Sequence, residues 1–307
     1  MQAVTVSTFG GPEALEVVDV PVPEPGPGQV RIRVQAAAVH PVDLGVRAGA
    51  FAQLLPSRPR YVLGWDLAGI VDTPGPGVAT FQPGDAVVGM TVWLQTLAGT
   101  QAQFAVLDAT AVAAAPSTAS PVEAATLPLN ALAAAQALDL LPDGTRSLAI
   151  TGAGGALGGY ATELAGRRGL SVHAVAGAGD EPFLRGQGAT FVARAEDPVA
   201  AIVEAAGGQV DAVLDTAGLG GAALAAVRDG GGFVPTVPPS SPPAERGIQV
   251  SGVEVVADGA QLAELVSLVE QGCLTLRVAE RYALADVAAA HARLEQGGVR
   301  GRLVLTP

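Results

Sequence analysis

Lysine is absent from the 307 residues of this chain, so all 17 basic residues are arginines. This absence excludes Schiff-base chemistry on a lysine amine, including the attachment of pyridoxal phosphate, and it excludes a Walker A nucleotide-binding motif. The basic residues are outnumbered by 29 acidic residues, which gives a net charge of −12. Because an acidic chain repels a polyanion, we expect no binding to nucleic acid.

Cysteine occurs once, as Cys273, which excludes an internal disulfide bond and any metal site that needs several thiolates. Long apolar runs are also missing, because the most apolar stretch, 124–141, is interrupted by Pro128, Asn130 and Asp139. The N-terminus has no basic segment followed by an apolar one. We therefore expect a cytoplasmic protein that does not associate with membranes.

The most informative stretch that is present covers residues 147–160, where an apolar strand runs into a glycine turn and an alanine-rich helix. Such a turn offers main-chain N–H groups and the positive end of a helix dipole to a phosphate. The spacing of Gly152, Gly155 and Gly158 departs from the strict G-x-G-x-x-G form. Further apolar strands nevertheless follow at the distances that a βαβ unit requires. The stretch predicts a site for a dinucleotide pyrophosphate, and a glycine turn that binds nothing is the alternative.

Two regions of different character indicate two domains. The first 120 residues contain short apolar runs separated by proline and glycine, which predicts a β-rich domain. From residue 121 helices and strands alternate, as in a doubly wound parallel sheet. The strands of this sheet are predicted at 147–151, 170–176, 190–193, 210–215 and 231–237, with a helix over 219–228 and a proline-rich loop over 235–243.

The C-terminal tail is expected to return to the first domain. It predicts a strand near 252–256, helices over 259–271 and 285–296, and a last strand over 301–305. The fold class is therefore α/β, with a β-rich domain formed by residues 1–120 and 258–307 and a Rossmann nucleotide-binding domain over 121–257.

Short motifs along nearly the whole chain carry a family resemblance, and they stand at 9–16, 21–28, 40–49, 64–69, 83–89, 124–128, 210–218 and 300–305. In this order they resemble a zinc-independent member of the medium-chain dehydrogenase/reductase superfamily, close to its quinone oxidoreductase (zeta-crystallin-like) branch. The resemblance implies a GroES-like catalytic domain built from both chain ends and a Rossmann domain between them. It also implies a cleft for nicotinamide and substrate, and a homodimer.

The same resemblance allows the positions of the zinc ligands to be compared. Zinc-dependent relatives have Gly-His-Glu at the position of residues 64–66 and a cysteine at the position of His40, whereas this chain has Trp65 in place of the histidine ligand. We therefore expect no bound zinc. Without a Lewis acid, the plausible chemistry is hydride transfer to an activated double bond, in a quinone or an α,β-unsaturated carbonyl compound.

Three residues are candidates for the catalytic site. His40 stands where the resemblance places asparagine, and it could donate a hydrogen bond or a proton to the substrate oxygen; a histidine bonded only to the backbone is the alternative. Phe51 replaces a tyrosine and is expected to form a hydrophobic wall. Asn130, in a helix where a threonine and an aromatic residue have become Ala133 and Ala135, could bind the nicotinamide carboxamide or the substrate, or could be an exposed helix residue.

The residues expected to contact the cofactor follow strand ends, apart from one near the C-terminus. They are Gly152, Gly154, Gly155, Ala156, Leu157, Gly158, Ala176, Gly177, Thr216, Ala217, Val237 and Arg302.

NADPH is expected to be preferred over NADH, because no acidic residue stands at the tip of the second strand. Two residues weaken that preference. Gly179 stands where similar sequences place arginine or lysine, and Asp180 would repel a 2′-phosphate if it pointed inward.

The sequence therefore predicts an NADPH-preferring, zinc-independent reductase of quinones or enones. Two alternatives stay open: an enoyl-reductase-like tailoring enzyme of a metabolite pathway, and a non-catalytic relative that binds nucleotide.

Overall fold

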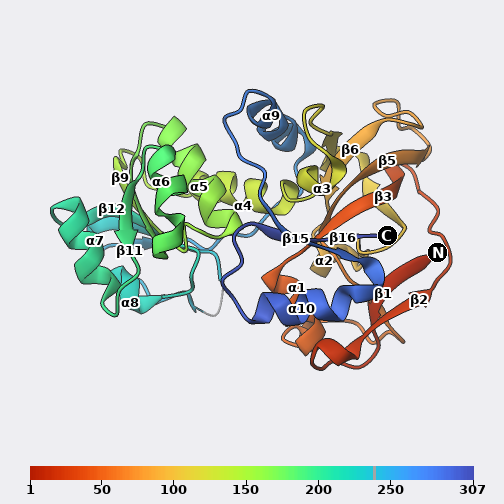
Figure 1. Ribbon diagram of the computed structural model, residues 1–307, viewed down its shortest axis with the longest axis horizontal. Coiled ribbons are helices and arrows are strands. Elements are labelled where there is room, and N and C mark those ends of the chain that lie inside the picture. Colours follow the sequence, from red (N-terminus) through yellow and green to blue (C-terminus); the bar gives the residue numbers. More distant parts are fainter. Residues whose placement is uncertain (238–239) are drawn as a thin grey trace. The chain divides into compact units, whose positions relative to one another are not determined.

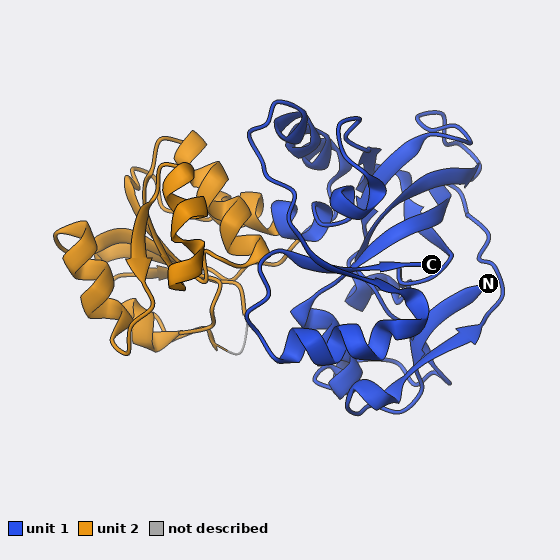
Figure 2. Cartoon of the chain, viewed as in Figure 1, with its two compact units in different colours: residues 1–132, 256–307 blue, residues 133–255 orange. Residues whose placement is uncertain are grey.

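The computed structural model describes residues 1–237 and 240–307, and Figure 1 shows the order of the helices and strands. The described chain divides into two compact units: unit 1 contains residues 1–132 and 256–307, and unit 2 contains residues 133–255 (Figure 2). The sequence placed the boundaries after residues 120 and 257. The first boundary lies later because helix α4 (Pro128–Asp139) begins against unit 1, where the N–H of Leu129 donates to Asp66 Oδ2 at 3.1 Å.

Unit 2 is built on a parallel sheet. Within the described residues the sheet has six strands in the order β11-β10-β9-β12-β13-β14, and the order reverses between β9 and β12. This is the strand order of a doubly wound dinucleotide-binding fold, so the Rossmann-type sheet predicted from the sequence is confirmed. The strands are β9 (Ser147–Thr151), β10 (Ser171–Ala176), β11 (Thr190–Ala193), β12 (Val210–Asp215), β13 (Val227–Pro235) and β14 (Gln249–Val250). The helices are α5 (Ala156–Arg167), α6 (Glu181–Gly186), α7 (Pro198–Ala206) and α8 (Gly221–Leu224).

Two predicted elements near this sheet are wrong. The helix predicted over 219–228 is limited to α8, because β13 already begins at Val227, which is fully buried. The strand predicted over 252–256 does not form. Its side chains alternate between half-buried and exposed as in a strand, and the N–H of Val253 donates to the carbonyl of Pro235 in β13 at 3.4 Å, but the regular pairing with β13 ends at β14. In the predicted proline-rich loop, positions 238–239 lie outside the described residues.

Unit 1 joins both ends of the chain in one sheet. Strand β16 pairs antiparallel with β3, with Val304 opposite Ala38, which confirms the predicted return of the tail. In the described residues this sheet has the order β15-β16-β3-β5-β6-β8, β7 pairs with β3, and a smaller sheet has the order β2-β1-β4. Strand β15 was not predicted. The strands are β1 (Gln2–Val6), β2 (Leu15–Asp19), β3 (Gln29–Val39), β4 (Tyr61–Val62), β5 (Asp66–Pro74), β6 (Ala86–Met90), β7 (Phe104–Asp108), β8 (Val112–Ala114), β15 (Val278–Ala283) and β16 (Arg302–Thr306).

The helices of unit 1 are α1 (Pro41–Ala48), α2 (Trp93–Thr96), α3 (Pro121–Ala124), the first part of α4, α9 (Gly259–Glu270) and α10 (Val287–Glu295). Among the described residues of the chain, no helix combines the length and the apolar character needed to cross a membrane.

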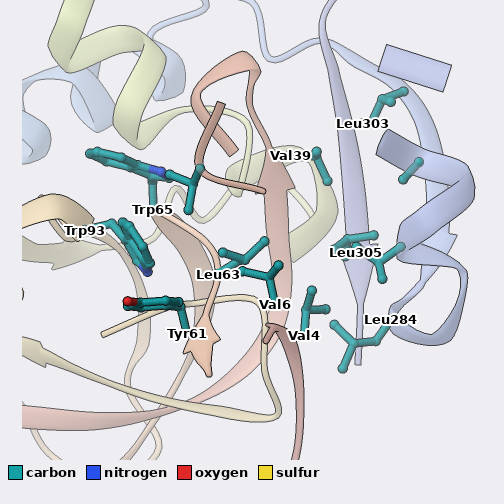
Figure 3. Close-up of a cluster of buried hydrophobic side chains, with 13 residues drawn as sticks. Val4, Val6, Val39, Tyr61, Leu63, Trp65, Trp93, Leu284, Leu303 and Leu305 are labelled. Carbon is teal, nitrogen blue, oxygen red and sulfur yellow. The ribbon is translucent and has the colours of Figure 1, made fainter. Parts of the chain in front are cut away.

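An aromatic cluster fills part of the core of unit 1 (Figure 3). The ring of Trp93 lies 6.2 Å from that of Tyr61 and 6.5 Å from that of Trp65, measured between ring centroids. Trp93 is fully buried, and its indole N–H donates to the carbonyl of Val62 at 2.6 Å. Aliphatic side chains from both ends of the chain pack with these rings, among them Val4, Val6, Val39, Leu303 and Leu305.

Replacing Trp93→Ala should lower the free energy of unfolding by about 3–5 kcal/mol, since it empties a large buried volume and leaves the Val62 carbonyl without its donor. Leu54→Ala is the matched control, because Leu54 is 76% exposed and its loss should change stability by less than about 0.5 kcal/mol. Urea unfolding of both variants measures the effect. Equal stability of the two variants would contradict this account of the core.

Candidate functional site

The glycine turn of unit 2 brings strand β9 and helix α5 into close contact. Gly152 has φ +66°, a conformation that favours glycine, and a Cβ at this position would meet Thr216 Oγ1 at 2.7 Å. A Cβ at Gly158 would overlap the carbonyl oxygen of Gly152. Gly155 precedes the first residue of α5 and supplies no side-chain cap. The turn therefore fits a dinucleotide pyrophosphate, which would be held by main-chain N–H groups and the helix dipole.

The loop after β12 is fixed beside this turn by a buried carboxylate. Asp215 accepts hydrogen bonds from Thr151 Oγ1 at 2.6 Å and from the N–H of Gly220 at 2.7 Å. Thr216 Oγ1 donates to the Thr151 carbonyl at 2.6 Å, and the N–H of Ala217 donates to Thr151 Oγ1 at 3.2 Å. The structure thus brings Thr216 and Ala217 together with the turn. The supporting role of Asp215 and Thr151 was missed, although both residues end apolar strands in the sequence.

The end of β10 completes this edge of the sheet. Ala176 ends the strand and Gly177 follows it, and the carboxylate of Asp180 lies against Gly154 of the glycine turn. The predicted preference for NADPH stays a prediction. Val237, the remaining predicted contact in unit 2, is 41% exposed.

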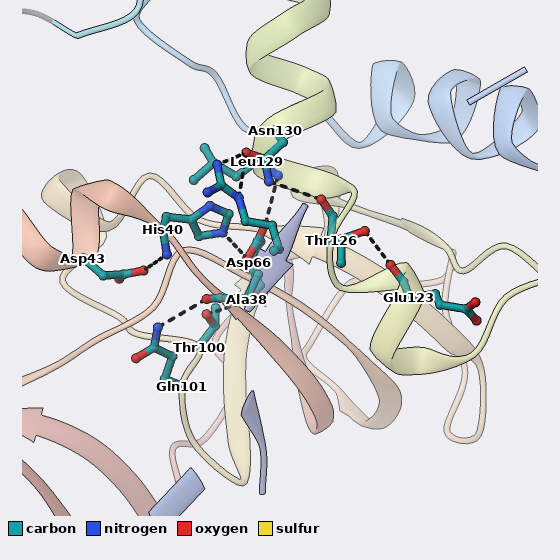
Figure 4. Close-up of polar contacts among 11 residues, drawn as sticks. Ala38, His40, Asp43, Asp66, Thr100, Gln101, Glu123, Thr126, Leu129 and Asn130 are labelled. Carbon is teal, nitrogen blue, oxygen red and sulfur yellow. Dashed lines mark hydrogen bonds and ion pairs between the residues drawn. The ribbon is translucent and has the colours of Figure 1, made fainter. Parts of the chain in front are cut away.

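A polar cluster in unit 1 surrounds His40, which lies between β3 and α1 (Figure 4). Its Nε2 lies 2.8 Å from Asp66 Oδ1, and the two side chains are 1% and 0% exposed. Burial lowers the pKa of His40 in spite of the opposing effect of Asp66, so the ring is neutral at pH 7.

The tautomer of His40 follows from this contact. A carboxylate only accepts hydrogen bonds, so Nε2 carries the ring proton and Nδ1 presents a lone pair. Nδ1 is buried and has no hydrogen-bond partner in the described part of the chain. The predicted donation from His40 to a substrate oxygen stays a prediction, and in the neutral ring the one N–H is already directed at Asp66.

Asn130 is buried rather than exposed, so the exposed-residue alternative is wrong. Its Oδ1 accepts from the guanidinium of Arg302, through Nε at 3.1 Å and through Nη2, and its Nδ2 donates to the carbonyl of Thr126 at 3.2 Å (Figure 4). Both polar atoms of the amide are therefore engaged inside unit 1. Asn130 positions Arg302, and the predicted contacts of both residues with a ligand stay predictions.

Asp43 is a further buried residue of this cluster, which the sequence analysis did not count among the candidate site residues. Its Oδ2 accepts from the N–H of His40 at 2.8 Å, whereas Oδ1 has no partner among the described residues. Burial raises the pKa of Asp43 to about 8, against the opposing effect of the His40 N–H. The signal in the sequence was its place in the first turn of a helix that begins at Pro41.

The positions that bind zinc in the resembling enzymes do not fit a zinc ion here. Trp65 is packed in the aromatic cluster, and His40 Nε2 is bound to Asp66. No group of three histidine, cysteine or acidic residues within the described residues is placed to hold a metal. Phe51 packs against the same core, and its predicted place in the wall of a substrate pocket stays a prediction.

Asp43→Asn should change how stability depends on pH. The folded pKa of about 8 lies above the ordinary value of 3.8, so the folded state keeps a proton that the unfolded chain releases within this window. The free energy of unfolding of the wild type should therefore fall as pH rises from 4 to 8, and the variant should lack this contribution. His291, whose pKa burial lowers to about 3, titrates in both proteins and cancels in the difference.

Thermal unfolding of the two proteins between pH 5 and pH 9 measures this difference. The midpoint of the variant should rise relative to that of the wild type with increasing pH. Parallel profiles would show that Asp43 is ionised in the folded protein.

Comparisons with known proteins give the same architecture. The family model described as the alcohol dehydrogenase GroES-like domain matches residues 26–117, and the model described as zinc-binding dehydrogenase matches residues 187–305. The quinone-oxidoreductase homolog of spinach (Spinacia oleracea) chloroplasts is 32% identical over 68% of this chain and 65% of its own length. The chloroplast envelope quinone oxidoreductase homolog of Arabidopsis thaliana is 33% identical over 71% of this chain and 68% of its own length.

Solved structures match over the full length. An NAD-dependent alcohol dehydrogenase has a TM-score of 0.88 at 32% identity, and mycobacterial Rv1454c complexed with NADPH has a TM-score of 0.87 at 28% identity. Each match covers 100% of both chains. By its motifs, its two sheets and these relatives, the chain belongs to the medium-chain dehydrogenase/reductase superfamily, in the quinone oxidoreductase branch.

Proposed function

We propose that this chain is a zinc-independent oxidoreductase that uses a nicotinamide dinucleotide to reduce quinones or α,β-unsaturated carbonyl compounds. One observation carries the proposal. Where zinc-dependent relatives place metal ligands, this chain has a histidine bound to a buried aspartate, His40–Asp66, and an indole, Trp65, packed in the core. These residues therefore offer no Lewis acid that could polarise an alcohol. A double bond that is already activated by a carbonyl group can accept hydride without a Lewis acid.

The glycine turn and the loops after β10 and β12 would hold the dinucleotide through main-chain groups. The cofactor, when bound, supplies the hydride. Gly152 and Gly158 keep the turn free of side chains, so that a phosphate can approach the backbone. The choice between NADPH and NADH depends on the surroundings of Asp180.

His40 is proposed to orient a ligand rather than to protonate it in its neutral form. Nδ1 can accept a hydrogen bond from a ligand N–H or O–H, while Asp66 holds the ring in place. Arg302, held by Asn130, lies near enough for its charge to lower the pKa of His40. Its guanidinium suits a phosphate or the developing negative charge on a substrate oxygen.

The names of relatives support the substrate class. The spinach and Arabidopsis proteins are named for quinones, and a tomato relative that is 28% identical is named 2-methylene-furan-3-one reductase. A tailoring enzyme of the enoyl-reductase kind and a non-catalytic nucleotide-binding protein are the alternatives. The tailoring alternative is favoured by Ala133 and Ala135, small buried residues where the resemblance places larger ones.

The purified protein should oxidise NADPH or NADH in the presence of quinones or enones, and a metal chelator should leave the rate unchanged. The decrease in absorbance of the reduced dinucleotide, followed against a panel of both acceptor classes, measures this activity. Elemental analysis of the same sample should show no stoichiometric zinc. Tight dinucleotide binding without turnover of any acceptor would favour the non-catalytic alternative.

His40→Ala should lower kcat by roughly 10²-fold, the scale of a lost orienting or proton-handling group, and should leave the Kd of the dinucleotide within about twofold. His40→Asn is the matched control, because it installs the residue that the resemblance implies and should retain more activity than alanine. Steady-state kinetics and calorimetric titration separate the two effects. Unchanged kcat in His40→Ala would remove His40 from the site.

A further inference from the structure

The carboxylate of Asp180 lies at the strand-end edge of unit 2, and the sequence left open whether it points inward. Asp180 ends the short 3₁₀ turn Ala178–Asp180 and directly precedes helix α6, but its side chain does not cap that helix. A Cβ on Gly154 would overlap the Asp180 carboxylate, and a Cβ on Gly177 would lie 3.6 Å from its Oδ2. The carboxylate therefore occupies the space between the glycine turn and the end of β10.

This space is where a doubly wound fold places the ribose of the adenosine. In that fold an acidic residue about 20 residues beyond the glycine turn accepts a hydrogen bond from the ribose 2′-hydroxyl. Asp180 stands 22 residues after Gly158 (180 − 158). It stands four residues beyond Ala176, the last residue of β10, in the turn that follows the strand tip.

We infer that Asp180 makes this chain select NADH over NADPH, by accepting hydrogen bonds from the ribose hydroxyls and repelling a 2′-phosphate. The inference rests on the proposed binding of a nicotinamide dinucleotide. It reverses the preference expected from the sequence, and it separates this chain from the NADPH-bound mycobacterial relative. A carboxylate beside a phosphate leaves two negative groups in contact, whereas the 2′-hydroxyl of NADH supplies a hydrogen-bond donor.

The cations of this edge are arranged in keeping with that selection. Arg185 donates to Glu181 at 2.7 Å, so its guanidinium is already engaged by a carboxylate on the same helix. Arg194 follows β11, and its main-chain N–H donates to the carbonyl of Ala176 at 2.9 Å. Its side chain is exposed, and it is the basic group that a 2′-phosphate at this edge would need. Arg194 therefore tests the opposite selection.

The experiment measures the Kd of NADH and of NADPH by calorimetry for the wild type and four variants. The wild type should bind NADH at least about tenfold more tightly than NADPH. NADH gains a charge-assisted hydrogen bond from its 2′-hydroxyl to Asp180, whereas the 2′-phosphate of NADPH is repelled by that carboxylate. Asp180→Ala and Asp180→Asn should weaken NADH binding and strengthen NADPH binding, so that the preference for NADH is lost. Asparagine keeps the shape of the side chain, so it reports on charge alone if alanine disturbs the turn.

The matched controls change charge nearby. Glu196→Gln removes an exposed carboxylate two residues after Arg194, and it should leave the ratio of the two Kd values within about twofold of the wild-type ratio. Arg194→Ala should also leave it unchanged. Tighter binding of NADPH by the wild type, lost in Arg194→Ala, would overturn the inference while the proposed function stands. Failure of folded wild-type protein to bind either dinucleotide would overturn the proposed function together with this inference.

Discussion

The close approach of helix α5 to strand β9 at the glycine turn is the constraint on which the nucleotide site depends. Gly152 and Gly158 meet through backbone atoms, and a methyl group on Gly158 would overlap the Gly152 carbonyl. Because the contact is made through backbone atoms, no side chain of Gly152 or Gly158 stands between the turn and a phosphate. The buried carboxylate of Asp215 then fixes the neighbouring loop through Thr151 and Gly220, so two loops are held at one edge by main-chain and short polar contacts.

In unit 1 the buried polar side chains around His40 are held by one another, at positions where no metal is expected. A buried histidine needs a partner, and Asp66 provides it; Asp66 in turn accepts from the N–H of Leu129. The amide of Asn130 does the same for Arg302. Each buried charge in this cluster is thus satisfied by a neighbour from a distant part of the sequence. Nδ1 of His40 and Oδ1 of Asp43 are among the buried atoms that have no partner in the described chain, and Nδ1 of His40 is the acceptor that the proposed function assigns to a ligand.

Sequence reasoning was most successful where the chemistry is local. The glycine turn, the parallel strands and the return of the tail to the first unit all follow from patterns of a few residues, and the structure confirms these elements. The predictions were wrong or left open where the outcome depends on tertiary contacts. Residues 252–256 have the alternation of a strand, but the regular pairing with β13 ends before them, and the direction of Asp180 could not be read from its position beyond the strand. The partners of His40 and Asn130 lie 26 and 172 residues away, which no local pattern reveals.

The absence of lysine has a consequence for how this chain handles buried charge. A buried lysine can lose its proton, but arginine stays charged, so each buried arginine must keep an acceptor. Arg47 is 3% exposed and is held by Glu295 and by the carbonyl of Gly10. The buried groups of unit 1 whose pKa shifts are therefore not basic side chains of this kind. Burial raises the pKa of Asp43, and burial together with the charge of Arg47 lowers the pKa of His291. Near neutral pH the side chains of Asp43 and His291 are uncharged in the folded protein. The buried positive charge of unit 1 is then carried by the guanidinium groups of Arg47 and Arg302.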